Sequence, residues 1–377
     1  MQVRRLYFTI GILLLPLCSW GALVSEADVA FAKGNYPRAI ASWMRLAKQN
    51  QVSAQFNLGR VFDIGAGVTT NSREAAKWYL LAASGGNPRA QYHLARLYHR
   101  GQGLDKDLTQ AMIWYQRAAA LGLSEAQFNL GVMYVEGDGV SADLTKAMFW
   151  FRRAALQGDV SGQFNLGVIY FNRATSGADY AAALYWYAQA SGQGHSKAQY
   201  SLGMMYANGW GVGRSEEQAY EWIQRAAQGG HADAQNDLAL IYLQGKGVGN
   251  NVEKALEWFE KAGLQGHVQA QQTLGALYQE FPGVPQDLTQ SFKWYSRAAE
   301  QGSITSQRVT GMMLMNGTGT AVDPNAAFDW FKQAAERGDS LAQRWVAACY
   351  QRGQGVAVDR QEAAKWLRRS LHGRQTE

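Results

Sequence analysis

Histidine is the residue type in this sequence best suited to bind a metal or transfer a proton near neutral pH. The histidines are His93, His99, His195, His231, His267 and His372. His93 and His99 are six residues apart in a segment with helical spacing, so their rings do not share one helix face. His195, His231 and His267 recur every 36 residues, directly after a glycine, which is typical of a turn. We therefore predict no metal site.

Other catalytic motifs are absent from the sequence. No Gly-x-Ser-x-Gly elbow and no phosphate loop occurs. The glycine-rich stretch 209–213 follows a predicted helix rather than a strand, which favours a structural turn over a nucleotide loop. The acidic pair Glu216 and Glu217 lies in the first turn of a predicted helix, where the helix dipole stabilises negative charge. We predict no catalytic residue and no cofactor.

The composition restricts the class of protein. The chain has 377 residues, 47% hydrophobic and 18% charged, which argues against disorder. Two cysteines are too few for a disulfide framework, and no Cys/His cluster suggests structural zinc. The formal net charge is +6 without a run of Lys and Arg, so we expect no nucleic-acid partner.

Residues 1–21 are predicted to be a secretory signal peptide. Two arginines precede an apolar segment over residues 6–17, and small residues at 19 and 21 suit cleavage before Ala22. A transmembrane anchor, the alternative, needs about 20 apolar residues. Leu17 precedes Cys18 where a lipoprotein signal needs a small residue, so we expect no lipid anchor. Cleavage leaves Cys349 as the remaining cysteine, and we predict a periplasmic protein.

A period of 36 residues organises the rest of the chain. Glutamine recurs at positions 55, 91, 127, 163, 199, 235, 271, 307 and 343. Tryptophan recurs at positions 78, 114, 150, 186, 222, 258, 294, 330 and 366. Both series keep the same spacing throughout, so each unit is expected to be one repeated structural element.

Two helices are predicted in each unit. In the first, Leu and an aromatic residue are four apart and share a face, with Gly or Ala between them to admit a neighbouring helix. A Gly-x-Gly-Val turn, as at 65–68, ends this helix. In the second helix, we expect the recurring Trp to pack against small Ala residues. A helix-capping residue is predicted before it, at Asn71, Asp107, Asp143, Asp179, Ser215, Asn251, Asp287, Asp323 and Asp359.

This pattern, Ala-Gln-Phe/Tyr-x-Leu-Gly-x-x-Tyr-x-x-Gly-x-Gly-Val followed by Asp-x-x-x-Ala-x-x-Trp-x-x-x-Ala-Ala-x-x-Gly, resembles the Sel-one-like repeat, a relative of the tetratricopeptide repeat. The resemblance implies an all-α fold, a right-handed superhelical solenoid of antiparallel helix pairs. We expect residues 53–377 to form nine repeats in one solenoid. Residues 22–52 resemble a shorter tetratricopeptide-like hairpin and are predicted to cap its N-terminal end.

Three units depart from the pattern. The fourth has Arg173 and Thr175 where the turn glycines are expected, and the seventh has Phe281 in place of the first one. The eighth has Thr310 and Leu314 in place of the Leu and the aromatic residue. Tolerated sequence drift and a specialised bend both explain such changes.

The first helix of each hairpin lines the concave face in proteins of tetratricopeptide type, and the resemblance places there the positions one, five and eight residues after Gln. These positions are apolar in the middle of the chain and basic toward its C-terminal end. The candidate partner-binding residues are Tyr92, Arg96, Phe128, Val132, Val135, Phe164, Val168, Phe171, Tyr200, Met204, Arg308 and Arg344. The aromatic members alternatively pack against neighbouring units. Trp210 and Trp345 also break the pattern and are secondary candidates.

An apolar stripe along a groove is typical of a protein-binding surface. We therefore expect a non-enzymatic solenoid that captures another protein, for example an envelope component, as a scaffold or regulator. The resemblance also implies an alternative, an immunity protein that neutralises a secreted antibacterial effector such as a phospholipase. A cell-wall or β-lactam-related hydrolase or binder is a further alternative, but the family members linked to it are Cys-rich, unlike this chain.

Overall fold

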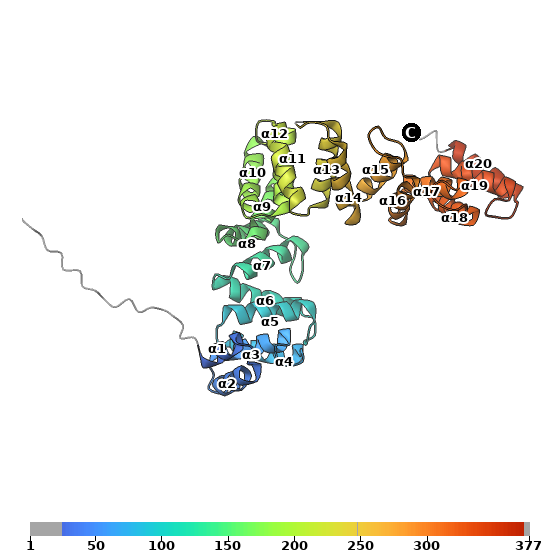
Figure 1. Cartoon of the computed structure of the whole chain (residues 1–377). Helices are drawn as coiled ribbons and strands as arrows, with labels where there is room; N and C mark the ends of the chain where they lie inside the picture. The colour runs from blue at the N-terminus through green and yellow to red at the C-terminus, as the bar shows by residue number, and fades with distance from the viewer. Residues whose placement is uncertain (1–24, 247, 373–377) are drawn as a thin grey trace, which may run out of the picture. The chain divides into compact units, whose positions relative to one another are not determined.

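The computed structural model describes residues 25–246 and 248–372, which are all-α apart from one isolated β-bridge between Phe281 and Val284. The predicted signal peptide lies outside the described residues. The helices form two compact units, residues 25–150 and 151–372 of the described chain, with the boundary inside one helix. Within each unit the helices pack in pairs in chain order, as a solenoid of the predicted kind (Figure 1).

Twenty helices occur in the described residues, two from the N-terminal hairpin and two from each of the nine repeats. The first helices are α1 (Glu26–Ala32), α3 (Val52–Ile64), α5 (Pro88–Arg100), α7 (Ser124–Glu136), α9 (Val160–Asn172), α11 (Ser196–Asn208), α13 (Ala232–Gln244), α15 (Val268–Gln279), α17 (Ile304–Asn316) and α19 (Ser340–Arg352). The second helices are α2 (Tyr36–Lys48), α4 (Ser72–Ser84), α6 (Leu108–Ala120), α8 (Leu144–Leu156), α10 (Gly177–Gly192), α12 (Glu216–Gln228), α14 (Val252–Leu264), α16 (Leu288–Glu300), α18 (Pro324–Glu336) and α20 (Arg360–His372).

The turn glycines serve two different purposes. Gly137 ends α7 in the left-handed conformation with φ 77°, which side chains other than glycine rarely adopt. Gly139, the second glycine of that turn, also has a positive φ and lies against the start of α6 in the preceding repeat. A Cβ atom at Gly139 would lie 2.8 Å from the carbonyl oxygen of Leu108. The second glycine therefore allows successive repeats to approach closely.

The predicted capping residues act as expected, with one exception. The side chains that accept a hydrogen bond from the backbone N–H three residues later are those of Asn71, Asp107, Asp143, Ser215, Asn251, Asp287, Asp323 and Asp359. The prediction for Asp179 was wrong, because α10 begins earlier and Ser176 is its N-cap. Asp179 instead completes a capping box, in which its carboxylate accepts from the backbone N–H of Ser176 at 3.2 Å.

The fourth repeat explains this shift. Without the turn glycines, Arg173 follows α9 in a right-handed conformation, and the connection to α10 shortens to residues 173–176. The corresponding connection after α3 covers residues 65–71. The missing left-handed turn thus lengthens α10 at its N-terminal end.

In the other two irregular repeats, the substituted residues are part of the core. Phe281 and Val284 pack against the cluster that contains α13 and α14, with Val284 buried. Thr310 and Leu314 are buried, and Leu314 belongs to the cluster around α18 and α19.

In the first eight repeats the residue after the recurring Trp is buried in the core, whereas in the last repeat Leu367 is exposed and Trp366 is buried. Phe259 and Phe331 are fully buried, whereas Trp258 and Trp330 are only partly buried. The same position lies against the small residue of the first helix, as Tyr187 does against Gly167. A Cβ atom at Gly167 would lie 2.5 Å from the Tyr187 ring, which confirms that the small residue admits a neighbouring helix. The burial of the recurring Trp varies along the series: Trp186 and Trp294 are buried, whereas Trp258 and Trp330 are partly exposed.

The recurring glutamine links successive helices. Its side-chain amide donates to the backbone carbonyl eight residues earlier, in the last turn of the preceding helix, where carbonyls lack an intrahelical partner. The bond from Gln271 to the Gly263 carbonyl measures 2.8 Å, and that from Gln91 to the Ala83 carbonyl measures 3.1 Å. The bond forms in all nine repeats. A buried amide at this position therefore gives a hydrogen bond to a backbone carbonyl at the C-terminal end of the preceding helix, which otherwise lacks a partner.

Candidate protein-binding surfaces

The twelve predicted binding residues all lie on first helices, divided between the two units. Five lie in the first unit, on α5 and α7, and seven in the second, on α9, α11, α17 and α19. Eleven are partly buried, and Val135 is 46% exposed. Partial burial is the state expected of side chains that pack at their base and present their tips to solvent.

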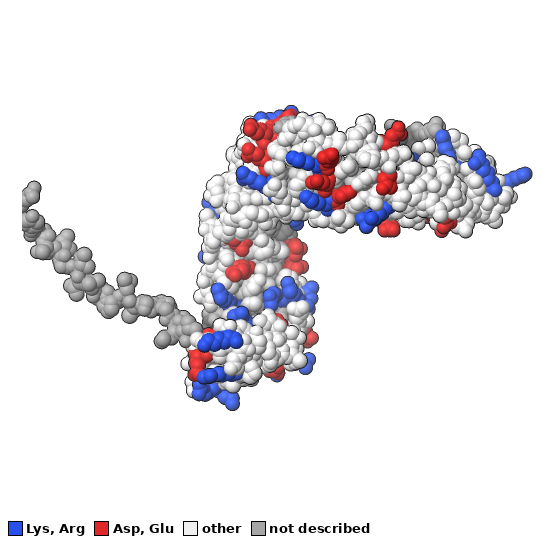
Figure 2. All heavy atoms as spheres, in the orientation of Figure 1, with Lys and Arg blue, Asp and Glu red and all other residues white. Residues whose placement is uncertain are grey.

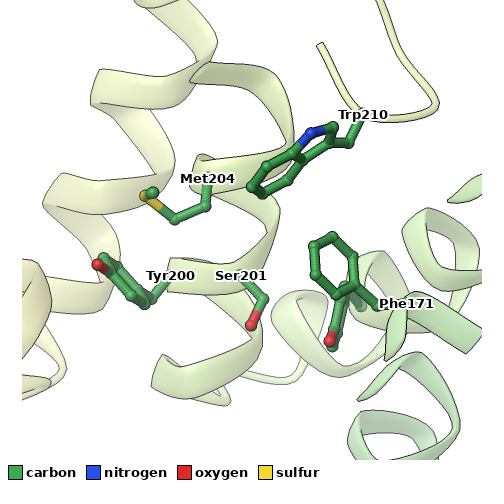
Figure 3. A pocket seen from close by; sticks show the side chains of 6 residues that line it. Phe171, Tyr200, Ser201, Met204 and Trp210 are labelled. Carbon is green, nitrogen blue, oxygen red and sulfur yellow. The ribbon is translucent and has the colours of Figure 1, made fainter. Parts of the chain in front are cut away.

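An aromatic pocket of about 190 Å³ in the second unit brings together three of these predicted residues. The aromatic pocket is lined by Phe171, Tyr187, Tyr200, Ser201, Met204 and Trp210 (Figure 3). Trp210 comes from the turn after α11, and its ring meets that of Phe171 edge-on with centroids 5.1 Å apart. Tyr200, Ser201 and Met204 project from α11. The result is an apolar recess with few polar groups.

Hydrogen bonds and burial hold the walls of the aromatic pocket in place. The Tyr200 hydroxyl donates to the Asp237 carboxylate at 2.7 Å, and the Tyr200 ring stacks on His231 with centroids 4.8 Å apart. Burial, and secondarily the Asp237 charge, raises the pKa of Tyr200 well above its usual range. Burial also raises the pKa of Tyr187 to about 12. Both phenols are therefore neutral at physiological pH, and the pocket wall carries no phenolate charge.

Phe164 and Val168, two further predicted residues of α9, do not line the aromatic pocket. Both pack against the cluster of α10 and α11. The Phe164 ring lies 5.9 Å from Tyr187 and 4.6 Å from His195, centroid to centroid. The alternative interpretation, that the aromatic residue after Gln packs against the neighbouring repeat, thus applies to Phe164.

The recurring histidines after the helix-ending glycine are N-caps. The Nδ1 atoms of His195, His231 and His267 accept hydrogen bonds from backbone N–H groups at 3.1, 3.3 and 3.1 Å. Burial lowers the pKa of His195 and His231, which favours the neutral ring that can accept this bond. No group of three His, Cys, Asp or Glu in the described residues is arranged to hold a metal ion.

A cationic pocket of about 140 Å³ in the first unit contains two further predicted residues. The cationic pocket is lined by Tyr92, Arg96, His99, Arg100, Tyr115 and Asn129. Arg96 donates to the Asp63 carboxylate at 2.7 Å, and His99 Nε2 lies 3.3 Å from an Asp138 carboxylate oxygen. Phe128, Val132 and Val135 lie on α7, and they are not among the lining residues of the cationic pocket.

The two predicted arginines near the C-terminus differ in their contacts. Arg308 Nε donates to the Asp339 carboxylate at 3.2 Å, and the Arg308 side chain is 20% exposed. Asp339 is itself the N-cap of α19, so Arg308 is committed to a contact between repeats. Arg344 is partly buried on α19.

Sequence reasoning missed several lining residues. Tyr115 and Tyr187 follow the recurring Trp and are buried. The sequence signal for them was a tyrosine, with its polar hydroxyl, at a position that other repeats fill with phenylalanine. Trp210 was noted only because it breaks the turn pattern. Ser201 and Asn129 lie two residues after the recurring Gln. This position holds many residue types in the other repeats, so the sequence offered no signal for them.

Comparison with known families identifies the repeat. The Sel1 repeat model matches residues 52–87, 88–123, 124–159, 160–195, 196–231, 232–267, 268–303, 305–339 and 340–371. The chain belongs to the Sel1 repeat family. The nine matches confirm the predicted resemblance and its all-α solenoid fold. Sel1 repeats generally mediate protein binding, and no helix of the described residues is long and apolar enough to cross a membrane.

Solved structures of bacterial Sel1 proteins are similar to this chain. A Sel1 repeat protein from Oxalobacter formigenes is 31% identical with a TM-score of 0.69, over 84% of this chain and 93% of that one. The protective antigen c5321 of uropathogenic Escherichia coli is 29% identical with a TM-score of 0.67, over 92% and 85% of the two chains. The immunity protein Pa5087 of Pseudomonas aeruginosa is 21% identical over 56% of this chain and 81% of its own, but its TM-score is only 0.36. No curated protein matches the sequence.

Proposed function

We propose that this Sel1 repeat protein is an exported, non-enzymatic binding protein that captures another protein as a scaffold or regulator. The aromatic pocket carries this proposal. Most of its lining residues lie on first helices, where the resemblance places the binding surface, and Phe171, Tyr200 and Met204 from the predicted set line it together.

The aromatic pocket suits a large apolar side chain of a partner. A cavity of about 190 Å³ between Phe171, Met204 and Trp210 offers contact to one aromatic or aliphatic side chain. Aromatic anchors in well-packed pockets dominate the energy of many protein interfaces. Methionine adapts its shape to the inserted group because its side chain is unbranched and flexible.

Export is a separate part of the proposal and rests on residues 1–21. Their pattern of arginines, apolar segment and small residues is that of a signal peptide. Cys349, the remaining cysteine after cleavage, is fully buried, and burial raises the pKa of its thiol to about 11. Such a thiol is unreactive, which suits an oxidising compartment such as the periplasm.

The test is affinity capture from an envelope extract with matched variants, followed by mass spectrometry. Met204→Glu and Trp210→Ala are expected to lose the partner that the unchanged protein retains, since truncating an interface anchor commonly costs about 2 kcal/mol or more. The matched control is Leu264→Glu, which places the same charge on a leucine that is 69% exposed on α14. A partner retained equally by all variants would show that the aromatic pocket is not the binding site.

The same capture separates a scaffold from the two alternative functions. If the partner is a secreted effector such as a phospholipase and its activity is lost in the complex, the immunity function replaces the scaffold function. Turnover of a β-lactam or of peptidoglycan by the purified protein would instead show an enzyme.

A further inference from the structure

The cationic pocket differs in chemistry from the aromatic pocket and lies in the other unit. Four of its residues come from α5, at spacings of three and four that place Tyr92, Arg96 and His99 or Arg100 on one face of the helix. Tyr115 of α6 and Asn129 of α7 complete the lining. Lys and Arg side chains gather over the α5–α6 hairpin (Figure 2). The site therefore combines guanidinium groups with a recess.

Arg96 has an unused hydrogen-bond donor. Its Nη2 donates to the Asp63 carboxylate at 2.7 Å. Its Nε is buried and has no hydrogen-bond acceptor among the residues that the structure describes. Buried donors are nearly always paired in folded proteins, so an unpaired one requires an explanation such as a ligand. An anion is the natural partner of a guanidinium N–H.

The charges around the cationic pocket suit a single negative charge. Arg96 and Arg100, one helical turn apart, both act electrostatically on the Tyr115 hydroxyl, which places both cations near its position. Asp63 faces Arg96, and Asp138 faces His99. Asp63 is thus paired with Arg96 and Asp138 with His99, which leaves Arg100 as the guanidinium of the pocket that makes no ion pair with the residues that the structure describes. A carboxylate, with one charge, matches this balance better than a phosphate, which carries about −1.5 to −2 near neutral pH.

We propose that the cationic pocket binds the carboxylate of an aspartate or glutamate side chain in an acidic segment of the partner protein. The inference rests on the proposed function, because it takes the ligand to be a polypeptide. The tyrosine rings of Tyr92 and Tyr115, with centroids 5.8 Å apart, offer an apolar wall for the methylene groups of such a side chain. The planar carboxylate fits the planar edge of the guanidinium.

The test observes Arg96 directly by NMR of the full chain with arginine labelled at Nε, using Arg96→Lys to assign the signal. The probes are the blocked peptides acetyl-Gly-Glu-Gly-amide and acetyl-Gly-Gln-Gly-amide, and inorganic phosphate. We expect the glutamate peptide to shift the Arg96 signal saturably and the glutamine peptide to leave it unchanged. A signal that none of the probes moves, or that phosphate moves but the glutamate peptide does not, would overturn the proposal.

A pair of charge variants provides an independent measurement. Arg100→Gln should weaken binding of the glutamate peptide about tenfold, the effect of one charge-assisted hydrogen bond. Arg117→Gln makes the same charge change on α6, where Arg117 stacks on Trp114 outside the pocket, and should leave binding unchanged. Equal effects of both variants would indicate general charge attraction and contradict the proposal. Partner capture through Met204 and Trp210 is measured separately, so failure of this inference can be distinguished from failure of the proposed function.

Discussion

His93 shows how burial acts on a single side chain of the first unit. Its ring stacks on Tyr79 with centroids 5.0 Å apart, and its Nδ1 lies 3.8 Å from an Asp63 carboxylate oxygen. Burial, and then the charge of Arg96, lowers the pKa of His93 from 6.5 to about 4, although Asp63 acts in the opposite direction. The folded chain therefore excludes a proton that the unfolded chain binds between these pH values.

The resulting pH dependence is testable at this residue. The contribution of neutral His93 to the free energy of unfolding is complete above pH 6.5 and is lost as the pH falls toward 4. This loss lowers the free energy of unfolding by on the order of 2–3 kcal/mol. In His93→Asn, which installs the residue found at the same register in Asn57 and Asn129, this part of the pH dependence should disappear. Urea unfolding of both proteins between pH 7 and 4 measures the difference. Parallel stability profiles would contradict the predicted role of His93.

Helix α7 begins without a side-chain cap. Its N-cap is Leu123, which makes no capping hydrogen bond, whereas Asp159 and Asp339 at the same register each accept one from the third backbone N–H at 2.7 Å. The neighbouring helices thus show that the local backbone accommodates an aspartate at this position.

Leu123→Asp is therefore expected to stabilise the first unit by about 0.5–1 kcal/mol, through the capping bond and the favourable helix dipole. The control is Leu121→Asp, two residues earlier, where Leu121 is 58% exposed and follows the C-terminus of α6. Negative charge is unfavourable at that end, so this variant should gain nothing. Chemical denaturation distinguishes the two, and equal changes in both would refute the capping explanation.

At the scale of the whole molecule, each repeat packs mainly on its neighbours. Phe259 is fully buried in the cluster of α13, α14 and α15. In an array of this kind, stability is the sum of the repeats and the interfaces between them, so damage stays local.

Phe259→Ala should cost about 3–5 kcal/mol, while Trp258→Ala, at a partly buried position, should cost less. In Phe259→Ala, the rate of backbone amide hydrogen exchange should rise in α13–α15 and stay unchanged in α3–α6 of the other unit. The unfolding transition of this variant should no longer be two-state. A uniform rise of exchange over both units would show global cooperativity instead.

The sequence alone determined the repeat, the helices and most of their ends. Helix hydrogen bonds, N-caps such as Asn71 and left-handed glycines such as Gly137 act within a few residues, so their types and spacing carry the information. The same locality explains the failure at Asp179, where the absence of turn glycines moved the cap to Ser176.

Only the tertiary structure decided which of two adjacent aromatic residues enters the core, and which side chains line a pocket. Trp258 and Phe259 are both apolar neighbours on one helix, and the packing of the facing helix buries Phe259. The aromatic pocket likewise depends on Trp210 of a turn meeting Phe171 of an earlier helix. Contacts between residues distant along the chain arise from how helices pack, and the spacing within one repeat does not encode them.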